Sequence, residues 1–325
     1  MKMYILLKTF SFFCICNLGT SPLHAAIHIG FWNVSNNPDN EVEDTSFSTV
    51  LSAMDRPDVY GLAETDTGSL VRFTGLLNDT HATTTYSSVS GASLGGDRTA
   101  LVYDTSTVSL VSSFEVTTDL TRPTIVGTFR PVGTTGDSDF SVVSVHLLSG
   151  SSSTDQAFRA GEAESLFSAT IALPNVIYGG DFNILGSSEA QYDTFTQDGF
   201  DLADAPGEYR DNIDFLSLHT QNPAAATDDR FDLIFASNDF RDGQGLEFVE
   251  GSYGVFGNNG THTLNESITT GTGASPEVLT ALTEASDHLP IFATFNFVPE
   301  PSSGLLAALG GTLLFIRRRN ENSNY

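Results

Sequence analysis

Cysteine and lysine are nearly absent from this chain of 325 residues. The only cysteines, Cys14 and Cys16, and the only lysines, Lys2 and Lys8, lie close to the N-terminus. Beyond that point the chain can form no disulfide, no thiol nucleophile and no cysteine-ligated zinc site. The 14 Lys and Arg residues face 40 Asp and Glu residues, which gives a formal net charge of −26. Such an acidic surface argues against broad electrostatic capture of nucleic acid or of an anionic membrane.

Residues 1–26 have the pattern of a secretory signal peptide. Lys2 and Lys8 supply positive charge, Phe10–Leu18 is largely apolar, and Leu23–Ala26 offers small residues for cleavage. The alternative is a buried first helix, which is disfavoured because a strand-like run follows at once. We therefore expect signal peptidase to act here and the remaining chain to be exported.

Residues 298–325 carry a second targeting pattern. Val298-Pro299-Glu300-Pro301 precedes the apolar run Gly304–Ile316, which is followed by Arg317-Arg318-Arg319. That run is shorter than the ~20 residues that cross a bilayer comfortably. The pattern resembles the PEP-CTERM sorting signal of Gram-negative bacteria. The resemblance implies transient membrane association through the tail, cutting by an exosortase, and a secreted or cell-surface product, whereas the alternative is a packed C-terminal helix.

Residues 27–297 alternate short strands with helical stretches and are expected to form one mixed α/β domain. Runs rich in Val, Ile, Phe and Tyr predict strands at Ala26–Val34, Val59–Ala63, Thr99–Tyr103, Ile125–Phe129, Phe140–Leu147, Asn175–Gly179, Phe231–Ala236 and Pro290–Phe297. Helices are predicted at Asp44–Met54, Ser69–Leu77, Thr154–Ala169, Ser188–Gln197 and Pro276–Glu284, with Ser69 and Thr154 as capping residues. Pro131–Asp139 and Gly257–Ser275 are expected to be loops.

Polar residues recur at the ends of these predicted strands, where layered α/β enzymes gather side chains from distant positions. Each has an ordinary alternative. Asp181 and Asn183 could stabilise a turn, His146 could be a core histidine, and Glu64 could end a strand in solvent. The ordered set favours a catalytic site. Its members are Phe31-Trp32-Asn33-Val34, Gly61-Leu62-Ala63-Glu64, Val145-His146-Leu147, Gly179-Gly180-Asp181-Phe182-Asn183, Arg230-Phe231-Asp232-Leu233-Ile234 and Ser286-Asp287-His288-Leu289-Pro290.

From Ile27 to Phe297 this ordered set resembles the endonuclease/exonuclease/phosphatase superfamily, which includes pancreatic-type DNases, abasic-site endonucleases, inositol polyphosphate phosphatases and bacterial sphingomyelinases. The resemblance implies a DNase I-like fold, a four-layer α/β/β/α sandwich of two mixed β-sheets flanked by helices. It also implies a monomeric, metal-dependent phosphoric ester hydrolase. Mg²⁺ or Mn²⁺ is the expected cofactor, with Ca²⁺ as a further candidate, because carboxylate oxygens suit these ions.

The resemblance also assigns roles to individual residues. Glu64 becomes the principal metal ligand, with Asn33 beside it and Asp287 completing the set. His288 becomes the general base or a charged partner of the scissile phosphate, and Asp232 orients it. The remaining roles are water orientation or proton transfer for Asp181, donation to the transition-state oxygens and phosphate binding for Asn183, and phosphate contact for His146.

Arg98 departs from the superfamily pattern. DNases commonly support the histidine that matches His146 with a glutamate near this position, where this chain has an arginine. Arg98 could bind the substrate phosphate, support His146, or pair with Asp97 at the surface. The role of His146 depends on which of these holds.

These features predict a secreted phosphodiesterase, most simply an endonuclease that hydrolyses extracellular DNA or RNA. A sphingomyelinase-like phospholipase is less favoured, because Trp32 is the only tryptophan and lies in a predicted core strand. A phosphomonoesterase for multiply phosphorylated substrates is also less favoured, because the arginines are few and spread along the domain. A non-catalytic extracellular matrix or surface protein is a fourth alternative.

Overall fold

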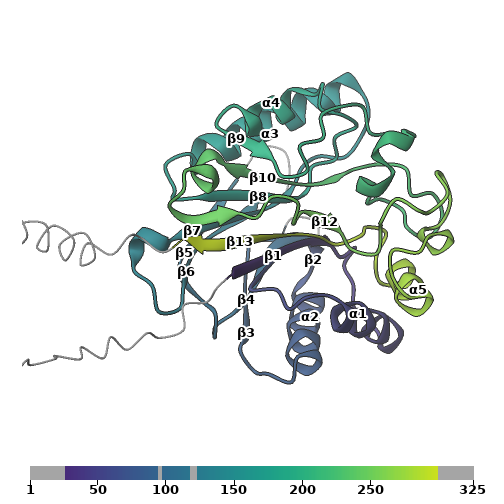
Figure 1. The fold of residues 1–325 in the computed structure, drawn as a ribbon, viewed down its shortest axis with the longest axis horizontal. Helices are drawn as coiled ribbons and strands as arrows, with labels where there is room; N and C mark the ends of the chain where they lie inside the picture. Colours follow the sequence, from purple (N-terminus) through teal and green to yellow (C-terminus); the bar gives the residue numbers. More distant parts are fainter. Residues whose placement is uncertain (1–25, 94–96, 118–122, 299–325) are drawn as a thin grey trace, which may run out of the picture.

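The computed structural model describes residues 26–93, 97–117 and 123–298. The predicted signal peptide and sorting tail, apart from Ala26 and Val298, lie outside the described residues. Two β-sheets stack face to face and helices cover both outer faces (Figure 1). The four-layer α/β/β/α sandwich implied by the resemblance is therefore confirmed.

The first sheet has the strand order β11-β13-β1-β2-β4-β3, with β12 also paired to β13. Strand β1 runs parallel to β2 and antiparallel to β13. The strands are β1 (Ala26–Asn33), β2 (Val59–Thr65), β3 (Tyr86–Ser90), β4 (Arg98–Asp104), β11 (Gly245–Phe248), β12 (Gly254–Val255) and β13 (Ile291–Val298). Helices α1 (Glu41–Ala53), α2 (Thr67–Thr80) and α5 (Pro276–Ala285) lie on its outer side (Figure 1).

The second sheet has the strand order β5-β6-β7-β8-β10-β9, in which β7 and β8 are parallel. Its strands are β5 (Val108–Val116), β6 (Thr124–Pro131), β7 (Phe140–His146), β8 (Val176–Asp181), β9 (Gly199–Asp201) and β10 (Asp232–Ser237). Helices α3 (Ser153–Thr170) and α4 (Ala190–Thr196) cover it. Short 3₁₀ helices occur at Gly136–Ser138, Ile213–Leu218, Asn238–Arg241 and Ile268–Thr270.

Phe31 brings the two sheets close together near the ends of their central strands. A Cβ atom added to Gly61 on β2 would lie 2.3 Å from the Phe31 ring, and one added to Gly179 on β8 would lie 2.2 Å from it. The two glycines therefore make room for this ring between the sheets. Ser144 on β7 also donates a hydrogen bond of 2.9 Å to the Leu62 carbonyl on β2. These contacts set the spacing of the strand ends that carry the polar residues.

The strands and helices predicted from sequence are all present, and the strand boundaries shift by no more than two residues. The predicted helix caps were wrong. Asp66 caps α2 through a reciprocal bond with Ser69, and Ser152 caps α3 in the same way with Asp155. Strands β3, β5, β9, β11 and β12 were not predicted. None of the described helices is long and apolar enough to cross a membrane.

Candidate active site

The polar strand ends converge at one edge of the sandwich. In the second sheet, Asp181 on β8 pairs in register with His146 on β7 and with Asp232 on β10. In the first sheet, Asn33 ends β1 beside the end of β2, where Glu64 lies. The convergence that the sequence predicted is therefore present.

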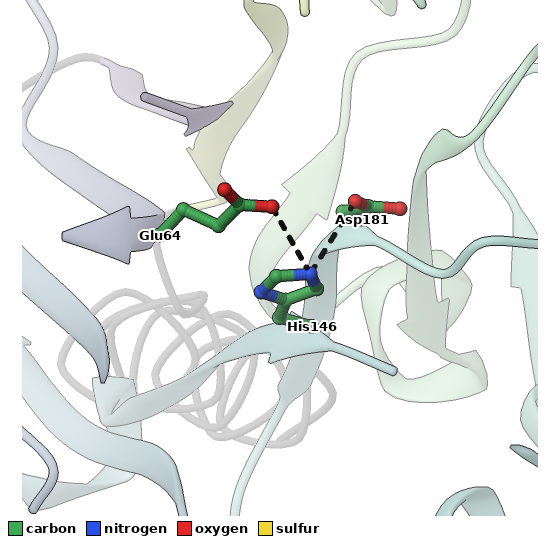
Figure 2. Close-up of side chains that lie close together, drawn as sticks. All are labelled: Glu64, His146 and Asp181. Carbon is green, nitrogen blue, oxygen red and sulfur yellow. Dashed lines mark ion pairs between the residues drawn. The ribbon is translucent and has the colours of Figure 1, made fainter. Parts of the chain in front are cut away.

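Glu64, His146 and Asp181 form a group that could hold a metal ion. The three potential ligand atoms lie within 4.8 Å of one another. His146 Nε2 is 3.6 Å from Glu64 Oε1 and 3.6 Å from Asp181 Oδ2 (Figure 2). Two carboxylates suit Mg²⁺, Mn²⁺ or Ca²⁺, whereas an imidazole is a softer ligand. The donor set therefore fits the expected divalent cation through its carboxylates.

Asn33 lies beside this group but presents its amide nitrogen to it. Nδ2 donates to Glu64 Oε1 at 3.0 Å and to Asp181 Oδ2 at 3.1 Å, while Oδ1 accepts from the Ser35 backbone N–H at 3.1 Å. An amide binds a metal ion through its oxygen, so metal binding by Asn33 would require its amide to turn over. In the described geometry Asn33 holds the two carboxylates together.

The backbone at Glu64 has a left-handed conformation, with φ of 47°. The β2–β4 pairing shifts register between Leu62 and Thr65, so Glu64 lies within a bulge. Its carbonyl accepts a hydrogen bond of 2.5 Å from the Asn36 backbone N–H. A left-handed glutamate costs about 1 kcal/mol or more. Bulges commonly re-aim a side chain near active sites, and here the Glu64 carboxylate reaches His146 and Asn33.

His288 and Asp232 form a buried ion pair. His288 Nδ1 lies 2.7 Å from Asp232 Oδ2, and the two residues are 5% and 0% exposed. Burial disfavours the charged ring, but the carboxylates of Asp232 and Asp181 outweigh it and raise the pKa of His288 to about 10. The histidine is therefore an imidazolium at neutral pH, and its Nε2 lies 3.8 Å from Asp181 Oδ2.

Asp181 belongs to the group that could hold a metal ion and also faces the Asp232–His288 dyad. Burial raises the pKa of its carboxyl to about 7, although the neighbouring His288 favours the ionised form. Its other oxygen, Oδ1, accepts from the Asn183 backbone N–H at 2.9 Å. Asn183 itself has a left-handed φ of 53° and donates from Nδ2 to the Leu147 carbonyl at 3.0 Å. Its predicted role toward the substrate stays a prediction.

Two of the predicted site residues lie apart from this group. Asp287 is exposed, its backbone carbonyl accepts from the Asn222 N–H at 2.7 Å, and it is not among the residues that could share a metal ion. Its role as a ligand stays a prediction. Arg98 begins β4 opposite Thr65, and its guanidinium donates to Ser90 Oγ at 3.3 Å.

The structure also reveals supporting residues whose roles the sequence did not predict. Ser286 Oγ donates to the Asn33 carbonyl at 2.6 Å and accepts from the His288 backbone N–H at 3.1 Å. Trp32 Nε1 donates to the His288 carbonyl at 2.8 Å. Ser286 lies in the Ser-Asp-His segment, which gave a signal for its importance. The bonds that involve Asn33 and Trp32 join segments more than 250 residues apart, which no local pattern reveals.

Comparisons with solved structures give the same fold. D. rerio TDP2 complexed with a single-strand DNA product is 17% identical, with a TM-score of 0.55 over 83% of this chain and 99% of that one. An endonuclease/exonuclease/phosphatase from Bacteroides vulgatus is 13% identical, with a TM-score of 0.57 over 84% and 99%. A mannosyl-6-phosphatase from Bacteroides thetaiotaomicron is 16% identical, with a TM-score of 0.52 over 83% and 100%.

No curated protein matches the chain. The model of one family, described as the endonuclease/exonuclease/phosphatase family, matches residues 30–288. The match runs from within β1 to the His288 segment, so it includes the convergent strand ends and all the described strands after β1 except β13. The chain therefore belongs to the endonuclease/exonuclease/phosphatase family.

Proposed function

We propose that this protein is a secreted, metal-dependent phosphodiesterase that hydrolyses extracellular DNA or RNA. The observation that carries the proposal is the buried Asp232–His288 pair beside the cluster of Glu64, His146 and Asp181. Hydrolysis of a phosphodiester requires an activated water, stabilisation of negative charge and assistance to the leaving oxygen. The two neighbouring groups have side chains of the kinds that these tasks require.

The charge of His288 and the position of Asp181 favour different roles for the two residues. With a pKa near 10, His288 is charged at neutral pH, which suits a cation that faces the developing negative charge on phosphate better than it suits a general base. Asp181, whose Oδ2 lies 3.8 Å from His288 Nε2, is suited to orient the attacking water. Asp232 keeps the His288 ring oriented through Nδ1.

Glu64 and Asp181 would hold the divalent ion, with Asn33 and Asp287 as additional proposed ligands. A bound ion would supply positive charge to the phosphate oxygens as negative charge develops there. His146 then lies where it can contact the same phosphate. Arg98 is the proposed cation at the rim, because it enters β4 beside the residue that follows Glu64.

A phosphate-ester substrate is supported by the family and by two neighbours of the same fold, of which the first favours a phosphodiester and the second a phosphomonoester. One neighbour is a TDP2 bound to a single-strand DNA product, and another is a mannosyl-6-phosphatase. Secretion rests on the sequence patterns of residues 1–26 and 298–325, with signal peptidase and an exosortase as the expected processing enzymes. The substrate class and the secretion are both parts of the proposal.

The test is hydrolysis of plasmid DNA, RNA and bis(p-nitrophenyl) phosphate by the purified protein with Mg²⁺, Mn²⁺ or Ca²⁺. We expect hydrolysis that requires the metal and falls by ~10²–10⁴-fold in Glu64→Ala and in His288→Ala. Glu250→Ala is the matched control, because Glu250 is exposed and pairs with Arg241 away from the site. Activity that survives both site substitutions would overturn the proposal. Sphingomyelin vesicles and p-nitrophenyl phosphate test the phospholipase and phosphomonoesterase alternatives.

A further inference from the structure

The two members of the buried dyad belong to different sheets. Asp232 is the first residue of β10 in the second sheet, whereas His288 lies just before β13 in the first sheet. The 2.7 Å contact between them therefore depends on how the ends of β10 and β13 are held relative to each other. Residues 219–222 lie between these ends, and Gln221 forms an isolated bridge with His288.

Thr220 is hydrogen-bonded to the backbone beside both members of the dyad. Its Oγ1 accepts from the Asp232 backbone N–H at 3.2 Å, and its carbonyl accepts from the Leu289 N–H at 2.8 Å. Its own N–H donates to the Asp229 carbonyl at 2.8 Å. The side chain is fully buried. One threonine thus touches β10 through its hydroxyl and the segment leading into β13 through its carbonyl.

The orientation of the Asp232 carboxylate depends strongly on its backbone. Oδ2 contacts His288, but Oδ1 is buried and has no hydrogen-bond partner among the residues that the structure describes. No second side-chain bond therefore fixes the carboxylate plane. The position of the Asp232 backbone, which the Thr220 hydroxyl and the β8 pairing hold, must do so instead.

The backbone at Thr220 is held in place because the preceding residue, His219, is itself fixed by hydrogen bonds. His219 is fully buried, and its Nε2 donates to the Tyr209 carbonyl at 2.9 Å. Asn258 donates from Nδ2 to the His219 carbonyl at 2.8 Å and to the Leu216 carbonyl at 2.9 Å. These bonds hold residues 216–219 through Tyr209 and Asn258, independently of Asp232 and His288.

We propose that Thr220 is a positioning residue for the dyad, and that its hydroxyl and carbonyl oxygens hold Asp232 and His288 at contact distance across the two sheets. The catalytic part of this inference rests on the proposed function. Thr220 is buried and acts through Asp232 and His288, without contact to substrate. Small displacements of catalytic groups, of about 1 Å, can cost on the order of 10²-fold in rate.

The first measurement is steady-state hydrolysis of bis(p-nitrophenyl) phosphate by Thr220→Val, which removes the hydroxyl at nearly constant volume. We expect kcat to fall by ~10-fold or more while KM changes by less than ~3-fold, because the substrate contacts remain. Thr220→Ser keeps the hydroxyl and should recover most of the lost kcat. Thr128→Val is the control, since Thr128 is also buried and bonds to Ser141 Oγ within the second sheet.

The second measurement is the NMR signal of the His288 Nδ1–H proton at fixed pH, which reports its contact with Asp232 and needs no activity. Thr220→Val should shift this signal upfield, because the contact lengthens, and Thr220→Ser should not. If Thr220→Val does not fold, Thr220→Ala provides the same loss of the hydroxyl without the branched side chain. A wild-type protein that hydrolyses no phosphoester would overturn the proposed function, while the Nδ1–H signal would still decide the role of Thr220. An unchanged signal in the hydroxyl-deleted variant, or equal impairment in Thr220→Ser, would overturn the inference.

Discussion

The burial of the Asp181 carboxylate lowers the stability of the folded protein. Its carboxyl is 2% exposed and lies near the carboxylates of Glu64 and Asp232. Burial raises its pKa to about 7, so the folded protein retains this proton to a higher pH than the unfolded chain does. Asp181 therefore destabilises the metal-free protein progressively from about pH 4 through about pH 7, and the cost is complete above that range.

Asp181→Asn should consequently stabilise the metal-free protein at pH 8 by ~1 kcal/mol or more while abolishing hydrolysis. Urea denaturation in the presence of EDTA measures the first effect. Mn²⁺ should stabilise the wild type and have little effect on the variant, because one of the two proposed metal-ligand carboxylates is lost. A variant that is less stable than the wild type at pH 8 would show that Asp181 supports the fold.

Asp232→Asn should lower the pKa of His288 from about 10 toward its ordinary value, because the carboxylate that contacts Nδ1 would lose its charge. In the wild type, the raised pKa gives stability that is fully present below about pH 6.5 and is lost as the pH rises through about 10. The variant should lose less stability across this window. NMR titration of the ring, together with denaturation at pH 7 and pH 10, tests both statements. Identical titrations in the two proteins would contradict the assignment.

Individual residues of the site differ in how far the sequence predicts them. Glu64 and Asp181 follow apolar runs at strand ends, so the pattern of the chain predicts that they meet. Thr220 is one threonine in a polar loop, and its role depends on the register of two sheets that no local pattern contains. The orientation of Asn33 toward both carboxylates is likewise a property of the folded arrangement.

At the scale of elements, central strands were predicted and edge strands were not. Strand β5 lies at the edge of the second sheet, and most of its side chains between Ser109 and Glu115 are exposed. It therefore lacks the alternation of apolar and polar residues that marks a half-buried strand. Its pairing with β6 through the backbone creates the strand. The short edge strands β9 and β11 have even fewer residues to form a pattern.

The cap of α3 offers a prediction about stability alone. Ser152 Oγ accepts from the Asp155 backbone N–H at 3.2 Å, and the Ser152 backbone N–H donates to Asp155 Oδ2 at 3.0 Å. Ser152→Ala should destabilise the protein by ~1 kcal/mol and leave the rate of hydrolysis unchanged, because the cap lies outside the catalytic group. Chemical denaturation and the phosphodiester assay measure the two quantities. A loss of activity without a loss of stability would assign the loop before α3 to the site.

The two loops at residues 205–230 and 256–275 are joined through the buried His262 ring. His262 Nε2 contacts the Thr227 carbonyl at 3.1 Å, and burial lowers the pKa of both His262 and His219. A lowered histidine pKa gives stability that is complete above about pH 6.5 and declines as the pH falls below it. His262→Gln, whose amide can donate to the same carbonyl, should therefore reduce the loss of stability between pH 7.5 and pH 5. Identical pH dependence in variant and wild type would exclude His262 as a contributor.

At the scale of the whole molecule, most of the few arginines that the structure describes are paired with carboxylates. After the expected processing the net charge becomes about −30, because most of the lost charges are lysine and arginine. Of the arginines that the structure describes, all but Arg98 form ion pairs with carboxylates. The pairs are Arg56–Asp104, Arg72–Asp44, Arg130–Asp139, Arg159–Glu189, Arg210–Asp229, Arg230–Asp201 and Arg241–Glu250.

We therefore expect moderate salt or added divalent cation to raise the apparent affinity for DNA, because the acidic surface repels the polyanion at low ionic strength. Fluorescence anisotropy with a labelled oligonucleotide, in the catalytically impaired His288→Ala variant, measures this dependence without cleavage. Binding that weakens steeply from the lowest salt concentration upward would instead indicate a basic groove. The expected dependence differs from that of proteins that neutralise many phosphates.

The pairing of β1 with β13 places the first and last described strands side by side in the first sheet, with Ala26 opposite Asn296. This contact spans nearly the whole domain, so closing it carries a large loss of chain entropy and slows folding. Until β13 arrives, β1 lacks one neighbour, and His288 cannot approach Asn33 or Asp232. The polar strand ends therefore come together only when the C-terminal strand is in place, and a chain in which β13 has not yet paired would lack the contact between His288 and Asp232.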